Sequence, residues 1–391
     1  MKNIISVAVA LIMLLLGCQS KSVESLQPDI DRISKRWVPD KRIGICSLSV
    51  VCGRGTKPVL KGESMFAGAT AEALQLFRSK GISIIDSVVI LPDTTLLEKS
   101  WGLITLSISN IRSKPAHSSE MVSQAIMGTP VRILKDVDGW ILIQTPDRYI
   151  GWTNKSAVQS MSWSEISNWR KADRMIYTES EGKIFADEEN TIVLSDLVAG
   201  AIVNRGLRNK NLIQVNLPDG RVGYVSGLNW VDFNQWKDTV ALNSERMIVS
   251  GKQLMGFPYL WGGTSSKGMD CSGFVKTVCF LNGVILERDA SQQIHHGAEV
   301  DLTSGLDKLK KGDLLFFGSK QPFRVTHVGI YIGDSEVIHE SGTAGSVHIN
   351  SLDKNSIIFR KDLSTNLVGA RRIIGISPEP GYWPVSLHNW Y

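Results

Sequence analysis

Two stretches of this chain repeat one short pattern, and that repeat constrains the fold more than any other feature. Residues 142–152 and 212–224 each hold an apolar stretch that begins Leu-Ile-Gln, a Pro-Asp turn signal and a second apolar stretch. The two copies are offset by 70 to 72 residues. Another strand-like stretch, residues 131–134, precedes the turn signal Asp138-Gly139. Short strands separated by turns, in two copies, predict two small β-barrels.

A different pattern begins near residue 243. Residues 244–254 read as a helix, and a second helix follows Cys271, with apolar residues at helical spacing. Strand-like stretches come next, at residues 313–317, 325–332 and 337–339. Helices followed by antiparallel strands are typical of an α+β domain.

The region before the first barrel is less regular. Residues 41–100 combine strand-like stretches at 43–51 and 83–91 with a helical pattern over 71–80, which ends at Gly81. We expect this portion to extend the first barrel. The predicted division is, in chain order, a leader (1–17), a tether (18–40), the extension with the first barrel (41–158), the second barrel (172–235), the α+β domain (243–375) and a tail (376–391).

The first residues have the pattern of a secretory signal. Lys2 precedes a mostly apolar run, residues 4–16, which is shorter than the ~20 residues of a spanning helix. Leu15-Leu16-Gly17-Cys18 resembles a bacterial lipobox, which implies cleavage before Cys18 and its acylation. The alternative is an ordinary signal peptide with a chance cysteine. With Gln19 rather than Asp after Cys18, the resemblance implies a lipid anchor in the cell envelope, on the periplasm-facing outer membrane.

Composition excludes several classes of function. The net charge of +5 is small for 391 residues and no Lys/Arg block occurs, so we expect no nucleic-acid partner. Five cysteines are too few for a disulfide scaffold, and Cys46 and Cys52 can bridge only if the chain turns between them. No CxxC or HxxxH spacing occurs, so we expect no metal site and no other cofactor.

Cys271 is the candidate nucleophile. It lies where a glycine-containing loop meets the start of a predicted helix. The partial positive charge of a helix N-terminus stabilises a thiolate, so this position predicts a lowered thiol pKa. The alternative is a buried, inert cysteine.

His327 is the candidate base and His339 the residue that orients it. Alternation along 325–332 places His327 on one face with Val325 and Gly329, which leaves room beside it, and places Thr326 in the core. If the next strand forms a hairpin with this one, His339 reaches the far ring nitrogen of His327. The remaining histidines show no such setting: His117, His295, His296, His348 and His388.

Five segments of the α+β region together resemble the NlpC family of papain-like cell-wall peptidases. They read PYLWGG, DCSGF, KKGDLLFF, THVGIYIGD and VIHESG. The barrels resemble bacterial SH3 domains, clearly in the first copy, where residues 109–115 match the opening pattern, and weakly in the second. The fold implied is α+β, a papain-like peptidase domain preceded by two SH3-like β-barrels.

The resemblance implies a cysteine peptidase that hydrolyses peptides containing D-glutamate and a diamino acid. Cys271 would attack the γ-D-glutamyl carbonyl, His327 would accept the thiol proton and His339 would orient His327. The backbone N–H of Cys271 and the hydroxyl of Tyr259 would stabilise the oxyanion.

SH3 domains before an NlpC domain resemble the γ-D-glutamyl-L-diamino acid peptidases of muropeptide turnover. In that subtype the first SH3 domain closes one end of the cleft, and the pocket takes a free N-terminal L-alanine. A buried ammonium needs an anionic partner. The residues implied to bind substrate are Asp270, Ser272, Asp289, Trp261, Tyr149 and Glu120.

Two alternatives stay open at this point. One is an endopeptidase with an open cleft that cuts stem peptides still attached to glycan. The other is a non-catalytic lipoprotein that binds the wall through its SH3 domains. In each case the expected partners are peptidoglycan-derived peptides, and the membrane through the lipid anchor.

Overall fold

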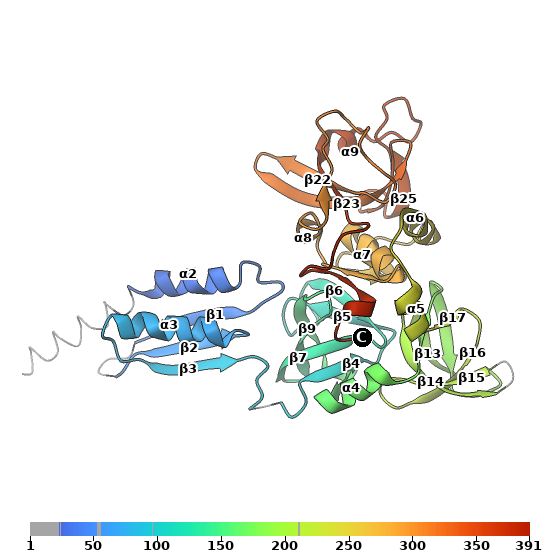
Figure 1. Cartoon of the computed structure of the whole chain (residues 1–391). Helices are drawn as coiled ribbons and strands as arrows, with labels where there is room; N and C mark the ends of the chain where they lie inside the picture. The colour runs from blue at the N-terminus through green and yellow to red at the C-terminus, as the bar shows by residue number, and fades with distance from the viewer. Residues whose placement is uncertain (1–22, 24, 53–55, 96, 210–211) are drawn as a thin grey trace, which may run out of the picture. The chain divides into compact units, whose positions relative to one another are not determined.

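The computed structural model describes residues 23, 25–52, 56–95, 97–209 and 212–391, so the predicted signal and Cys18 lie outside the described residues. The chain divides into two compact units, one ending at Glu98 and one spanning Lys99–Tyr391 (Figure 1). Among the described residues, no helix has the length and apolar character that crossing a membrane requires.

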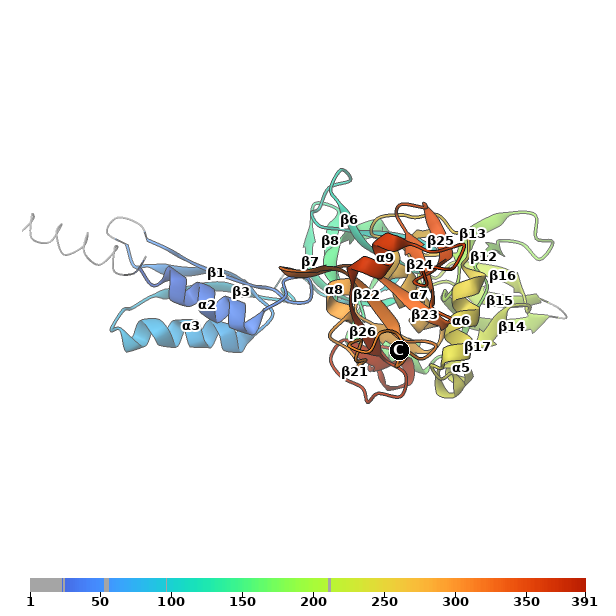
Figure 2. The ribbon, with the colours of Figure 1, turned by 90° about the horizontal axis from the view of Figure 1, so that it is seen from above.

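The first unit is a small α/β structure. Strands β1 (Cys46–Val51), β2 (Val59–Ser64) and β3 (Ile85–Ile90) form one sheet, antiparallel between β1 and β2 and parallel between β2 and β3. Helices α2 (Gln27–Trp37) and α3 (Ala67–Ser79) lie side by side on it (Figure 2). Helix α3 stops before Gly81, whose φ of +68° suits glycine. Cys46 and Cys52 are both free thiols.

Two sequence-based expectations for this unit were wrong. Residues 27–37 form helix α2 rather than a tether, because Ile30 and Ile33 share one face and bury it. The unit also has its own hydrophobic core, where Ile30, Leu60 and Phe77 are completely buried. It therefore forms a separate domain and does not extend the first barrel.

The repeat predicts two barrels, and the second unit contains both. The first has strands β4 (Trp101–Ile104), β5 (Ile108–Arg112), β6 (Met121–Ile126), β7 (Pro130–Val137), β8 (Trp140–Gln144), β9 (Ile150–Asn154) and β10 (Val158–Met161). The second has β11 (Arg174–Tyr177), β12 (Glu181–Phe185), β13 (Val193–Val198), β14 (Ile202–Asn209), β15 (Leu212–Asn216), β16 (Val222–Ser226) and β17 (Trp230–Asp232).

The two barrels share one topology. Each strand of the first barrel corresponds to the strand seven places later in the second, so that β4 corresponds to β11 and β10 to β17. With this correspondence, the order β10-β4-β7-β8-β9-β5-β6 in the first sheet equals the order β17-β11-β14-β15-β16-β12-β13 in the second. The repeated segments are the antiparallel pairs β8–β9 and β15–β16. Asp138 and Gly139 both have positive φ, as a tight turn between β7 and β8 requires. Helix α4 (Trp163–Lys171) connects the barrels, and α5 (Phe233–Thr239) follows the second.

The remaining part is α+β. A central sheet has the order β21-β26-β22-β23-β24-β25, with strands β21 (Ala298–Glu299), β22 (Leu314–Lys320), β23 (Phe323–Gly333), β24 (Glu336–Ser341), β25 (Ser346–Ser351) and β26 (Leu367–Arg372). The helices are α6 (Ser244–Gln253), α7 (Cys271–Leu281), α8 (Ala290–Gln293) and α9 (Lys361–Asn366). Short pairs complete it: β18 (Thr264–Ser265) with β19 (Gly268–Met269), and β20 (Val284–Leu286) with β27 (Tyr382–Pro384).

Helix α7 is the central helix of this part. It packs against β23 and β24, and Phe274, Val328 and Ile330 are completely buried in the core between them. In Figure 1 the helix lies between this sheet and the strands of the first barrel. The start of α7 therefore lies near all the elements that contribute to the candidate site.

A β-bulge changes the predicted face pattern of β23. Phe317 pairs with His327, but the next residue, Gly318, pairs with Val325, so Thr326 is an extra residue. Val325 consequently joins the core beneath α7, and Thr326 is exposed. The alternation over 325–332 was therefore wrong for these two residues.

The segment 376–391 connects the parts of the second unit. Strand β27 pairs with β20 of the α+β part. The Tyr391 ring lies 6.0 Å from that of Phe233 beside the second barrel and 6.1 Å from that of Phe280 in α7. The Trp390 ring meets Trp101 of the first barrel edge-on. The predicted tail is thus packed against both barrels and the α+β part.

Candidate active site

Cys271 is the first residue of α7, as the sequence predicts. Asp270 caps the helix: its Oδ1 accepts from the backbone N–H of Gly273 at 2.8 Å, and its Oδ2 accepts from Gly262 at 3.0 Å. The backbone N–H groups of Ser272 and Val328 face the Cys271 sulfur. Val328 directly follows His327, so the thiol lies beside the strand that carries the candidate base.

The thiol is protonated in the resting site. Burial, followed by the negative charge of Asp270, raises the pKa of Cys271 to about 12, although the two facing amides and the Arg288 charge lower it. The helix N-terminus alone predicts a lowered pKa. That expectation was wrong, because a buried helix start next to a carboxylate disfavours the thiolate.

A series of hydrogen bonds fixes the tautomer of His327. Its Nε2 lies 2.8 Å from Nδ1 of His339, and His339 Nε2 lies 3.0 Å from Oδ1 of Asn350. The Asn350 amide is oriented by its Nδ2, which donates to the carbonyl of Ile358. An amide oxygen only accepts, so the single proton of a neutral His339 is on Nε2. His339 Nδ1 then accepts from His327 Nε2–H, which leaves Nδ1 of His327 unprotonated and available to accept a proton.

Both rings are neutral near pH 7, as this assignment requires. Burial, followed by the nearby His339, lowers the pKa of His327 to about 3. Burial also lowers the pKa of His339 to about 4. Gly329 provides the space for this packing, since a Cβ there would lie 2.9 Å from the Cβ of His339.

Asn350 and His348 are two residues that sequence reasoning missed. His348 Nε2 lies 2.7 Å from Oδ1 of Asn350, and its Nδ1 lies 2.8 Å from the carbonyl of Ser346. His348 pairs directly with His339 across β24 and β25. The expectation that His348 has no setting near the site was therefore wrong. The signal was the His-Ile-Asn alternation, which puts 348 and 350 on the same strand face.

Tyr259 lies close to the nucleophile. Burial, followed by the charges of Cys271 and Asp270, raises the pKa of Tyr259 to about 12, so its hydroxyl keeps its proton and can donate. Its ring packs against Gly342, where a Cβ would lie 3.3 Å from the ring.

Asp270 and Ser272 are occupied by another side chain. Arg288 donates to Asp270 Oδ1 at 2.9 Å, to Asp270 Oδ2 at 2.5 Å and to Ser272 Oγ at 2.8 Å. The Arg288 side chain is only 1% exposed, so this is a buried, bidentate ion pair. Arg288, which the sequence analysis missed, binds the Asp270 carboxylate and the Ser272 hydroxyl that were assigned to substrate. In this structure they hold the guanidinium and the helix start.

The other four predicted substrate residues meet where the first barrel contacts the peptidase part. Tyr149 Oη lies 3.4 Å from Oδ2 of Asp289. Trp261 Nε1 donates to Oε1 of Glu120 at 2.9 Å, and the Trp261 side chain remains open to solvent. Each pair joins one residue of the barrel to one of the peptidase part. Together they place the carboxylates of Asp289 and Glu120 at contacts between the barrel and the peptidase part.

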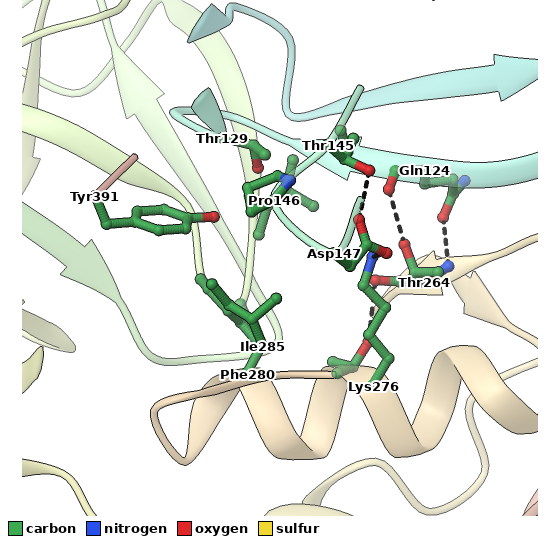
Figure 3. A pocket seen from close by; sticks show the side chains of 14 residues that line it. Gln124, Thr129, Thr145, Pro146, Asp147, Thr264, Lys276, Phe280, Ile285 and Tyr391 are labelled. Atoms are coloured by element: carbon green, nitrogen blue, oxygen red, sulfur yellow. Dashed lines mark hydrogen bonds and ion pairs between the residues drawn. The ribbon is translucent and has the colours of Figure 1, made fainter. Parts of the chain in front are cut away.

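Deeper contacts fix this junction. Figure 3 shows Gln124 bound to Thr264, whose backbone N–H donates to Gln124 Oε1 at 2.9 Å. Lys276 of α7 lies 2.7 Å from the buried carboxylate of Asp147. A cavity of about 70 Å³ lies between these contacts and Tyr391. The barrel is therefore held against α7 by buried polar groups.

Comparisons with known proteins agree with this geometry. Residues 256–363 match the NlpC/P60 family, and residues 111–158 match the bacterial dipeptidyl-peptidase Sh3 domain. Dipeptidyl-peptidase 6 of Lysinibacillus sphaericus is 29% identical over 68% of this chain and 97% of its own length. Gamma-D-glutamyl-L-lysine dipeptidyl-peptidase of Bacillus subtilis is 28% identical over 62% of this chain and 78% of its own length.

Solved structures show the same fold. An NlpC/P60 family protein from Bacillus cereus superposes with a TM-score of 0.60 at 23% identity, over 70% of this chain and all of its own. An NlpC/P60 endopeptidase from Photobacterium damselae gives a TM-score of 0.52 at 17% identity, over 70% of this chain and 72% of its own. The papain-like α+β fold with SH3-like barrels, expected from the sequence, is confirmed. Residues 256–363 thus form an NlpC/P60 cysteine peptidase domain, and residues 111–158 a bacterial SH3 domain.

Proposed function

We propose that this peptidase hydrolyses the bond between γ-D-glutamate and the diamino acid in peptidoglycan-derived peptides that begin with a free L-alanine. The observation that supports the proposal is the contact between the first barrel and the peptidase part, which brings Tyr149 to Asp289 and Glu120 to Trp261. Two carboxylates there suit the ammonium of an unblocked N-terminus. A muramyl group on that nitrogen would remove the charge and need the space that the barrel fills.

In the proposed reaction, His327 Nδ1 takes the proton of the Cys271 thiol as the sulfur attacks the γ-carbonyl carbon. His327 then gives this proton to the leaving nitrogen as the C–N bond breaks, which leaves a thioester. Water, deprotonated by His327, hydrolyses the thioester and releases L-Ala-γ-D-Glu and the thiol. The Cys271 backbone N–H and the Tyr259 hydroxyl are the proposed oxyanion donors, each worth about 3 kcal/mol in comparable sites.

The pKa values make the order of events specific. With the Cys271 pKa raised to about 12 and the His327 pKa lowered to about 3, the resting pair is neutral thiol and neutral imidazole. The thiolate therefore forms only as the sulfur attacks bound substrate.

The location of the enzyme is part of the same proposal. The sequence before Cys18 supports cleavage and lipidation there, and Gln19 supports an outer-membrane anchor that faces the periplasm. Labelling cells with an alkyne fatty acid should mark the wild type and not Cys18→Ser. Equal labelling of both would contradict the anchor.

The decisive experiment offers two substrates to the purified enzyme. One is free L-Ala-γ-D-Glu-meso-diaminopimelate, and the other carries N-acetylmuramic acid on its L-alanine. Mass spectrometry should show cleavage of the free peptide alone, absent in Cys271→Ala and weakened in Asp289→Asn. Cleavage of both would favour the endopeptidase with an open cleft. Cleavage of neither would leave a wall-binding lipoprotein.

A further inference from the structure

A groove of about 490 Å³ lies on the side of the two catalytic-site histidines, and the proposed reaction does not yet use it. His327 and His339 line one end. The buried apolar side chains Phe317 and Leu363 also line it. Its size falls within the range of small-molecule sites.

The leaving residue has to enter this groove if the proposed function holds. In the proposed function, the acyl part of the substrate extends from Cys271 toward the Tyr149–Asp289 and Trp261–Glu120 contacts. The scissile nitrogen must meet His327, because His327 returns the proton to it. The residue on that nitrogen therefore extends past His327, where the groove begins.

The charges along the groove suit a particular diamino acid. Arg360 and Asp362 form a bidentate ion pair with contacts of 2.9 and 2.7 Å, so their charges largely offset each other. Arg324 is exposed in the groove and, within the described part of the chain, has no acidic partner. With neutral histidines, the lining has one uncompensated positive charge.

We propose that Arg324 selects a leaving residue whose side chain ends in a carboxylate, as meso-diaminopimelate does, over one that ends only in an ammonium, as L-lysine does. The inference rests on the proposed function. The side-chain carboxylate of diaminopimelate binds the Arg324 guanidinium, and the neighbouring ammonium faces Asp362. The methylenes between the two centres pack on Phe317 and Leu363. Lysine brings a second positive charge to a positive groove.

Three tripeptides test this selection. All begin L-Ala-γ-D-Glu and end in meso-diaminopimelate, in its side-chain carboxamide, or in L-lysine. We expect wild-type kcat/KM to be about five- to tenfold higher for the first than for the others, which is the range of one partly solvated charge pair. Arg324→Gln should abolish that preference by lowering kcat/KM for the diaminopimelate peptide to the level of the lysine peptide, whose own kcat/KM should not fall. Arg208→Gln, an exposed arginine of the second barrel, is the matched control.

Independent readouts separate this inference from the proposed function. In the inactive Cys271→Ala protein, calorimetry should show tighter binding of the diaminopimelate peptide, weakened by Arg324→Gln and by 0.5 M NaCl. An equal loss for all three peptides in Arg324→Gln, or a wild-type preference for lysine, would overturn the selection while the peptidase activity stands. Absence of turnover for every peptide would instead overturn the proposed function.

Discussion

Asn350 gives the sharpest test of the proton arrangement. Its Oδ1 accepts from His339 and lies 2.7 Å from His348 Nε2, and the amide is oriented through Ile358. Asn350→Leu removes the acceptor at similar volume and leaves the buried N–H of His339 without a partner. Such a loss costs about 1–3 kcal/mol. The competing tautomer, with the proton on His339 Nδ1, then gains population and no longer accepts from His327.

Because about 1.4 kcal/mol corresponds to a factor of ten in rate, kcat should fall by about 5- to 150-fold while KM changes less than twofold. Asn350→Asp keeps an acceptor at the same place and should retain more activity. Nitrogen-15 NMR of the histidine rings should find His339 Nδ1 unprotonated in the wild type and partly protonated in Asn350→Leu. A leucine variant with wild-type melting temperature, kcat and ring tautomers would refute the assignment.

Three further predictions concern stability and the thiol. Burial, with the nearby charge of Asp270, raises the pKa of Glu340 from 4.5 to about 8, and its two oxygens have no hydrogen-bond partner among the described residues. Its folded-state pKa exceeds the unfolded value, so the wild type loses stability as the pH rises from about 4.5 through 8, and Glu340→Gln should be more stable above pH 8 by at most about 5 kcal/mol. Urea unfolding at pH 6 and pH 9 checks this, and identical pH dependence in both proteins would contradict it. Lys276→Met leaves the buried Asp147 carboxylate unpaired and should lower the free energy of unfolding by about 3–5 kcal/mol, most of which Asp147→Asn in the same protein restores. If calorimetry shows the single variant as stable as wild type, the ion pair does not hold the junction. Alkylation of Cys271 by iodoacetamide, followed by peptide mass spectrometry, should be slow at pH 7 and still rising at pH 10, because its pKa is raised to about 12. A plateau below pH 8 would show a thiolate in the resting enzyme.

The sequence predicts the individual helices and strands of this enzyme well, and their packing and pairing less well. The helix beginning at Cys271 and the two strands carrying His327 and His339 follow from spacing, because each is a short-range pattern, whereas the pairing of those strands was only assumed. The prediction of a tether over residues 27–37 was wrong. Two isoleucines in a polar stretch become the buried face of a helix only when a sheet is present for the helix to pack against. The bulge at Thr326 leaves no trace in alternation.

The site residues fall into the same two groups, those found in a local sequence motif and those placed only by tertiary contacts. Cys271, His327 and His339 each stand in a recognisable segment. Asn350 comes from a strand whose pairing partner has to be known before the amide can be placed beside His339. The same holds for Arg288, whose burial against Asp270 depends on two segments 18 residues apart folding together. Burial also decides the pKa of Cys271, and a helix start read from sequence carries no information on depth.

The loop before Cys271 is shaped by the first barrel as much as by the peptidase part. A Cβ on Gly262 would lie 2.3 Å from the carbonyl oxygen of Met121, Thr264 is held by Gln124, and the Gly262 amide in turn holds the Asp270 that caps α7. The barrel is thus not an interchangeable targeting module. Replacing it with another wall-binding domain would change substrate choice. It would also remove the barrel surface that supports the loop before Cys271. Inheritance of the two domains as one block is the expected evolutionary result.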